Sequence, residues 1–185
     1  MAYRNGTYVA FHANGTNIPG KSDIDYYNLM RAWSAKPDDD FTLVNSHEKV
    51  SAVRDSSAKE TLRRSLHERL KNSKNMVLII GKTTKYDTDW VPFEIERAVD
   101  TYKIPIIACY TDTEKPIRNP RLWSEYWPAA LKKRIDEGTA NVIHVPFKKA
   151  VILDAIGQFS HSKLPVGAGL GYYSDAAYRS FGVAG

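Results

Sequence analysis

Short apolar runs alternate along the chain with longer segments in which apolar residues recur every three or four positions. The short runs are rich in β-branched and aromatic residues, which favour strands, and the periodic segments are typical of amphipathic helices. The pattern predicts five strands, over residues 7–11, 41–45, 76–80, 104–110 and 141–147. Strands that alternate with helices at these lengths predict an α/β domain, a parallel sheet with helices on both faces.

Capping signals mark where three of the helices begin. Ser22 or Asp23 can cap the first helix, and Asp89 can cap the third. Ser57 and Glu60 have the spacing of a capping box at the start of the second. The apolar positions expected to face the core in these three helices are Tyr26, Leu29, Met30 and Trp33, then Leu62, Leu66 and Leu70, then Val91, Ile95, Ala98, Val99 and Tyr102.

The C-terminal part of the chain has a less regular pattern. Trp123, Trp127, Leu131 and Ile135 predict a helix that Pro128 interrupts, and residues 149–160 predict a last helix. From residue 164 onward the chain is rich in Gly and Tyr. We therefore expect one domain over residues 1–163, followed by a tail over residues 164–185 that packs on the domain or extends from it.

Composition narrows the class of protein. The 43% hydrophobic and 25% charged residues are ordinary for a globular domain, and no apolar run reaches the length of a membrane span. The N-terminus has no signal-peptide pattern, and the single cysteine, Cys109, lies in an apolar run, so we expect a cytoplasmic protein that does not bind membranes. A net charge of +5 suits an anionic ligand. The densest basic run shares its helix with Glu60 and Glu68, which favours a solvated face over nucleic-acid binding.

The polar segments that follow the strands are where chemistry is expected. In parallel α/β sheets ligands bind outside the carboxyl ends of the strands, which here lead into residues 12–23, 45–56, 81–90 and 111–120. His12 follows the first predicted strand and Asn45 ends the second. Asp55, Ser56 and Ser57 precede a helix, where free backbone amides suit a phosphate, although capping alone also explains Ser57.

Glu94 is the side chain most suggestive of catalysis. It lies in the first turns of the helix that follows the 81–90 loop, at the border of that helix's apolar face. A carboxylate partly shielded from water there can act on a sugar hydroxyl or stabilise a cationic sugar centre. The alternative is a first-turn glutamate that interacts favourably with the helix dipole and has no other role.

Other catalytic patterns are missing from the sequence. There is no nucleophile elbow, Walker loop, GxGxxG motif or zinc-ligand spacing, so we expect no metal. A receiver domain is disfavoured because no Asp ends the strand over residues 76–80, and a metal-dependent nuclease is disfavoured because carboxylates are not clustered.

Several segments taken together resemble the TIR-like family that includes the Thoeris B proteins of bacterial antiphage defence. Trp90-Val91-Pro92-Phe93-Glu94-Ile95 is similar to the Trp-Val-x-x-Glu-Ile form that carries the catalytic glutamate of TIR NADases. The other segments are Tyr8–Phe11, Tyr26–Trp33, Ala52–Ser57, Leu66–Leu70 and Val77–Gly81. The resemblance is good over residues 7–110 and loose beyond them.

The resemblance implies a flavodoxin-like TIR fold and NAD as the substrate, with no separate cofactor. It implies that Glu94 assists cleavage of the bond between nicotinamide and ribose, and that the ADP-ribosyl unit is then hydrolysed or cyclised. The side chains that would line the pocket are Phe11, His12, Asn45, Asp55, Ser56 and Trp90, although Trp90 is equally suited to packing. The resemblance also implies self-association and a separate effector reached through a diffusible nucleotide signal. The alternative is a TIR interaction module without enzymatic activity.

Overall fold

A six-stranded parallel sheet forms the centre of this computed structural model, which describes residues 4–14, 20, 22–39, 41–44 and 56–185. The strands, in their order across the sheet, are β2 (Thr42–Val44), β1 (Gly6–Ala10), β3 (Ser73–Ile80), β4 (Ile106–Tyr110), β5 (Val142–Pro146) and β6 (Gly171–Tyr172). The predicted parallel α/β architecture and its five strands are confirmed. The sixth strand escaped prediction because a Gly-Tyr pair carries no strand pattern.

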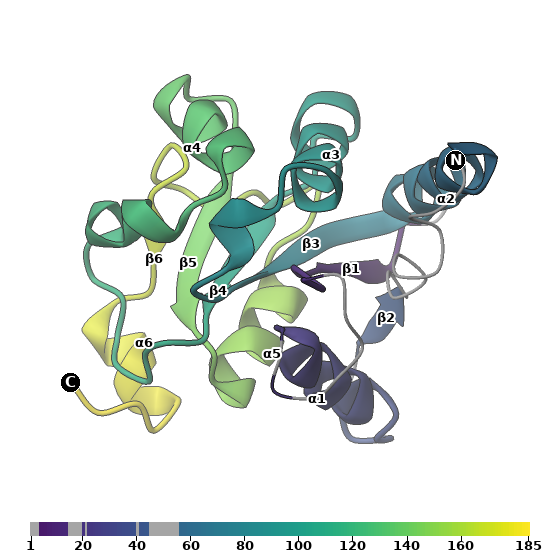
Figure 1. Ribbon diagram of the computed structural model, residues 1–185. Helices are drawn as coiled ribbons and strands as arrows, with labels where there is room; N and C mark the ends of the chain where they lie inside the picture. The colour runs from purple at the N-terminus through teal and green to yellow at the C-terminus, as the bar shows by residue number, and fades with distance from the viewer. Residues whose placement is uncertain (1–3, 15–19, 21, 40, 45–55) are drawn as a thin grey trace.

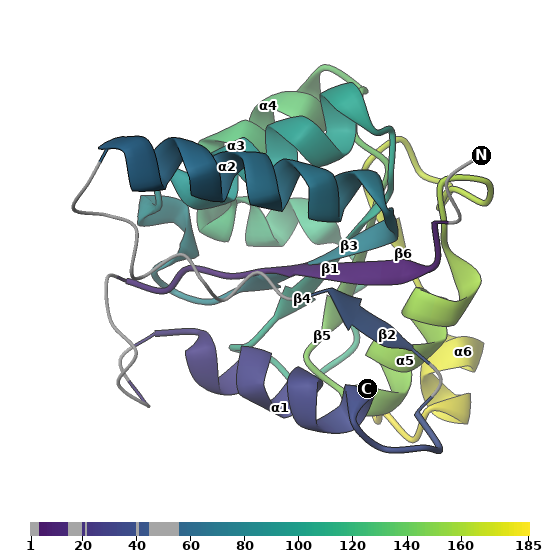
Figure 2. The same ribbon diagram turned by 90° about the vertical axis from the view of Figure 1, so that its right-hand side faces the viewer.

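Helices cover both faces of the sheet (Figures 1 and 2). The helices α2 (Ser56–Lys71), α3 (Trp90–Glu96) and α4 (Ala129–Asp136) lie on one face. The helices α1 (Ile24–Ser34), α5 (Lys149–Gln158) and α6 (Asp175–Ser180) lie on the other. Because side chains alternate along a strand, Tyr8 and Ala10 of β1 join the first core, whereas Val9 and Phe11 join the second.

The buried face of α1 differs from the predicted one. Leu29 is 45% exposed, and the residues that α1 buries are Ile24, Tyr27, Met30 and Trp33. Both sets have helical spacing and share two members, so the sequence does not distinguish rotations that differ by one residue. Tyr27 stacks on Phe11 with a centroid separation of 4.7 Å, and this contact lies on the face that α1 turns toward the sheet.

The other helices follow the predicted pattern with local changes. All five apolar positions predicted for the third helix are buried, but the α-helix ends at Glu96 and continues as a π-helical turn, Arg97–Thr101. Pro128 separates a 3₁₀ helix, Pro120–Tyr126, from α4, as expected for a residue that cannot continue a helix. The second helix begins at Ser56, one residue before the predicted cap.

A buried histidine links the C-terminal segment to the sheet. The Trp127 indole N–H donates to the Tyr110 hydroxyl at 2.7 Å, so that hydroxyl donates its own proton to His144 Nδ1, also at 2.7 Å. The proton of the neutral imidazole is therefore on Nε2, which donates to the backbone oxygen of Gly169 at 2.9 Å. Among the described residues, no helix has the length and apolar character needed to cross a bilayer.

Candidate active site around Glu94

The connection between β3 and α3 sets where α3 begins. Asp87 Oδ1 accepts hydrogen bonds from the backbone N–H groups of Asp89 and Trp90, each at 2.9 Å. Asp89 was predicted to cap α3, but it makes no side-chain cap hydrogen bond and instead pairs with Lys59 and with Arg63, the latter at 2.8 Å. The capping role therefore belongs to Asp87, and Asp89 joins α3 to α2.

Glu94 is completely buried between α3 and β1. Its Oε1 accepts a short hydrogen bond from the hydroxyl of Tyr8, which is also completely buried and lies within β1. Burial raises the pKa of Tyr8 well above its ordinary value, and the Glu94 charge and hydrogen bond raise it further. Tyr8 is therefore protonated at neutral pH and remains a donor that orients the Glu94 carboxylate.

The sequence pattern gave no reason to single out Tyr8. It lies in a strand whose other members are small or apolar, and its ring belongs to the core. The one available signal was a hydroxyl in a strand buried on both faces, because a buried hydroxyl needs a partner.

The other predicted site residues are spread over both faces of the sheet. Phe11 stacks in the core opposite the one that contains Tyr8. His12, just after β1, contacts the Thr83 hydroxyl through Nδ1 at 3.2 Å. Trp90 is 9% exposed and packs in the same core as Tyr8, with the Lys59 and Arg63 cations 5.7 and 5.9 Å from its ring centroid.

Three predicted residues lie wholly or partly outside what the structure describes. Asn45 and Asp55 fall outside the described residues. Ser56 is described only as the first residue of α2, without its side chain.

A second buried polar group lies where β3 ends. Asp23, 6% exposed at the start of α1, accepts a hydrogen bond from the Thr84 hydroxyl at 2.9 Å. Thr84 Oγ1 in turn accepts the backbone N–H of Gly81 at 2.8 Å. Asp23 was predicted only as a helix cap, yet it makes no side-chain cap hydrogen bond. The signal for its actual role, a partner 61 residues away, is absent from the local sequence.

A groove of about 680 Å³ lies between α2 and α3. Phe93 lines it, with the guanidinium groups of Arg63 and Arg97 at 5.6 and 5.4 Å from the centre of the Phe93 ring. Glu94 is not among the lining residues, because its side chain is directed to Tyr8 within the core. The groove and the buried carboxylate therefore belong to different sides of α3.

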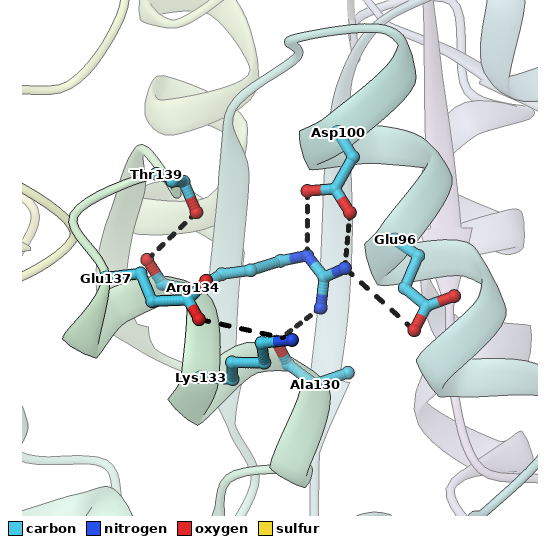
Figure 3. A network of polar contacts seen from close by, with 7 residues as sticks. All are labelled: Glu96, Asp100, Ala130, Lys133, Arg134, Glu137 and Thr139. Carbon is cyan, nitrogen blue, oxygen red and sulfur yellow. Dashed lines mark hydrogen bonds and ion pairs between the residues drawn. The ribbon is translucent and has the colours of Figure 1, made fainter.

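Arg134 of α4 binds the continuation of α3 (Figure 3). Its guanidinium donates to both oxygens of Asp100, with the Nε bond at 2.9 Å, and to the backbone oxygen of Ala130 at 3.0 Å. Glu96 lies 3.9 Å away. The Arg134 side chain is only 9% exposed, whereas that of Asp100 is 51% exposed. This ion pair fixes the C-terminal end of the helix that carries Glu94.

Replacing Arg134 and replacing Asp100 should lower the free energy of unfolding by unequal amounts. Arg134→Met keeps most of the aliphatic packing and leaves Asp100 free to be hydrated, so the free energy of unfolding should fall by about 1 kcal/mol. Asp100→Ala leaves a buried guanidinium with fewer acceptors and should lower it by roughly 2 kcal/mol, a value reduced for the exposure of Asp100. Urea denaturation measures both.

Glu137→Gln is the matched control for this pair. It removes an exposed partner of Lys133 at 4.0 Å on the same helix surface and should change stability by less than roughly 0.5 kcal/mol. If Arg134→Met and Asp100→Ala lowered the free energy of unfolding equally, the prediction that the loss of Asp100 costs more stability would be wrong.

No group of three or more His, Cys, Asp or Glu side chains within the described ranges is arranged to hold a metal ion. The chemistry that this part of the chain offers is that of a buried carboxylate, its phenol donor and the polar groups after β1 and β3.

The segment that contains Tyr8 and Glu94 matches a known protein family. Residues 8–116 match the family model described as Thoeris protein ThsB, TIR-like domain. The match covers more than half of the 185 residues, from Tyr8 through Glu94 to the loop after β4. The chain therefore belongs to the family of TIR-like domains of the Thoeris protein ThsB.

Proposed function

We propose that this protein is an NAD-processing enzyme that cleaves the bond between nicotinamide and ribose, with Glu94 as the catalytic carboxylate. The observation that carries the proposal is the burial of Glu94 beside a fixed phenol donor, in a family of TIR-like domains. A glutamate whose only role is to favour the helix dipole has no need of burial or of a hydrogen bond to the sheet.

In the proposed reaction the main contribution of the protein is to stabilise the positive charge that develops on the ribose. As the C1′–N bond lengthens, its electron pair goes to the ring, nicotinamide leaves as a neutral molecule, and the ribose gains oxocarbenium character. Glu94 in its ionised form would stabilise this positive charge and accept a hydrogen bond from a ribose hydroxyl. Tyr8 would hold the carboxylate in one orientation, because its proton stays in place at neutral pH.

The fate of the ADP-ribosyl cation decides the product. Attack by water gives ADP-ribose and a proton, whereas attack by a nucleophilic nitrogen of the same molecule's adenine gives a cyclic product. A site that excludes water favours cyclisation. The burial of Glu94 supports the cyclic product, which we propose as the signal passed to a separate effector in antiphage defence.

The proposal requires Glu94 to become accessible to the substrate. The carboxylate has no exposed surface, so side chains that cover it must move when NAD binds. We expect slow turnover by the dilute chain and faster turnover where self-association or an infection signal favours the open arrangement.

The test is incubation of the concentrated purified chain with NAD and, in parallel, with NADH. Free nicotinamide and an ADP-ribose species are expected from NAD only, because dihydronicotinamide lacks the positive charge that makes nicotinamide a neutral leaving group. Mass spectrometry separates the cyclic product from the linear one by the mass of one water. If NAD stays intact even in lysate from phage-infected cells, the interaction-module alternative replaces the enzyme.

A further inference from the structure

We infer that Asp23 is a positioning residue, which holds the connection between β3 and α3 and thereby sets where Glu94 lies. The connection comprises residues 81–89. The part of the inference that concerns catalysis rests on the proposed function. The part that concerns the connection rests on contacts alone.

Asp23 organises the connection mainly through the Thr84 hydroxyl. Its Oδ2 accepts from Thr84 Oγ1 at 2.9 Å, and the same Oγ1 accepts from the Gly81 N–H at 2.8 Å. Thr84 is completely buried, so water does not replace either bond. The carboxylate of one helix thus fixes two points of a loop on a different part of the chain.

The usual reason for an aspartate at the start of a helix is missing here. Asp23 occupies the N-cap position of α1 without a side-chain cap hydrogen bond, and its backbone N–H bonds weakly to the His12 oxygen at 3.4 Å. A Cβ atom at position 81 would collide with Asp23 Oδ1, so Gly81 leaves the space that the carboxylate occupies. The position of the Asp23 carboxylate therefore requires a residue without a side chain at position 81.

Hydrogen bonds continue from Thr84 to the first turn of α3. Thr84 begins a 3₁₀ turn in which the Asp87 N–H donates to the Thr84 oxygen at 3.2 Å. Asp87 then accepts from the N–H of Trp90, the first residue of α3, at 2.9 Å. Glu94 lies about one turn further along. A shift of Thr84 would thus displace the start of the helix that carries Glu94.

The charged groups around Asp23 make this arrangement sensitive to pH. Asp112, after β4, repels the Asp23 carboxylate, and Lys82 lies 3.8 Å from Asp112. Asp25 of α1 accepts from the Gly20 N–H, and among the described residues no Lys or Arg forms an ion pair with Asp23. Burial raises the pKa of Asp23 to about 6, Asp112 adds to the increase, and the Thr84 and Gly81 hydrogen bonds oppose it.

The ionised carboxylate is the stronger acceptor for the Thr84 hydroxyl. Acidification through about pH 6 should therefore weaken the hold on the connection. Because His12 also faces this region through Thr83, its titration must be separated from that of Asp23. The Asp23→Asn variant makes this separation, since it keeps His12 and removes only the carboxyl.

The test compares Thr84→Val, Thr84→Ser and Asp23→Asn in the full chain, with each variant's folding checked by circular dichroism. Thr84→Val removes the hydroxyl and should lower kcat on NAD about 10-fold or more with KM nearly unchanged, because Glu94 is misplaced while substrate contacts remain. Thr84→Ser should restore most of the rate. The wild-type kcat should fall below about pH 6, whereas Asp23→Asn should be slower and flat across that pH.

Amide hydrogen exchange separates this inference from the proposed function. Protection of residues 81–89 should fall about 10-fold or more in Thr84→Val relative to Thr84→Ser, whether or not NAD is turned over. Equal protection in the two variants would overturn the positioning role. So would an unchanged kcat in folded Thr84→Val, or an inflection near pH 6 that persists in Asp23→Asn. A wild-type chain that leaves NAD intact even in lysate from phage-infected cells would refute the proposed function and leave the exchange result to decide the role of Asp23.

Discussion

Replacing Glu94 with glutamine should lower the rate of nicotinamide release from NAD by about 100-fold or more, because the amide carries no charge to stabilise the oxocarbenium-like transition state. The amide oxygen can still accept the hydrogen bond from Tyr8, so the core around it should remain packed. Single-turnover rates at matched protein concentrations measure the change. Thermal unfolding of the same samples shows whether the fold is preserved.

Glu96→Gln is the matched control for this prediction. Glu96 lies two residues further along α3 and is exposed, so its replacement should leave the rate within about twofold of the wild type. Tyr8→Phe should give an intermediate loss of about 10-fold, since the carboxylate keeps its charge but loses the donor that orients it. A Glu94→Gln variant as active as the wild type would exclude Glu94 as the catalytic group.

A second large effect is expected in how stability depends on pH, where two buried groups act in opposite directions. Burial lowers the pKa of His144 to about 4 from its ordinary 6.5. Between these values the unfolded chain binds the extra proton, so the His144 contribution falls as the pH falls from 6.5 to 4. The full change is about 3 kcal/mol, at about 1.4 kcal/mol for each pKa unit.

Asp23 has the opposite sign. Its pKa is raised to about 6 from 3.8, so between these values the folded chain binds the extra proton. The Asp23 contribution therefore grows as the pH falls from 6 to 3.8, again by about 3 kcal/mol in total. The two contributions nearly cancel between pH 4 and 6 in the wild type.

Asp23→Asn should remove this cancellation. Relative to the wild type, the variant should become less stable by about 3 kcal/mol as the pH falls from 6.5 to 4. Urea denaturation of both proteins at several pH values in this range gives the difference directly, and titrations common to both cancel. A constant difference across the range would mean that Asp23 titrates normally in the folded chain. Compared with the wild type, the variant should be more stable near neutral pH than it is near pH 4, and it should be less active near neutral pH. This combination is typical of residues kept for function.

Periodicity alone predicted most of the architecture. The strands β3 and β4 carry continuous buried apolar runs, Met76–Ile80 and Ile106–Tyr110, and the buried positions of α3 recur at helical spacing, so local sequence determines them. The rotation of α1 and the two residues of β6 depend on contacts with distant segments. Tyr27 meets Phe11, and β6 pairs with β5, and neither partner is visible in a local pattern.

The candidate site was predictable only in part. Glu94 stood out because a carboxylate followed a strand-end loop at the edge of an apolar helix face. Its donor Tyr8 is 86 residues away, and Asp23 is 61 residues from Thr84. Such pairs are set by the order of the strands in the sheet, and local spacing has no information on that order. Trp90 also shows that a residue in a family motif can be used for packing, and Asp89 shows that a predicted cap can pair with a neighbouring helix instead.

The outer strands have a consequence for how copies of this protein meet. Within the described part of the chain, the sheet ends in a three-residue strand, β2, on one side and a two-residue strand, β6, on the other. Such short margins offer few backbone donors and acceptors for adding a further strand from another chain. Assemblies of this protein should therefore join through the side chains of its helices and loops, which makes them reversible and sensitive to salt rather than fibrous.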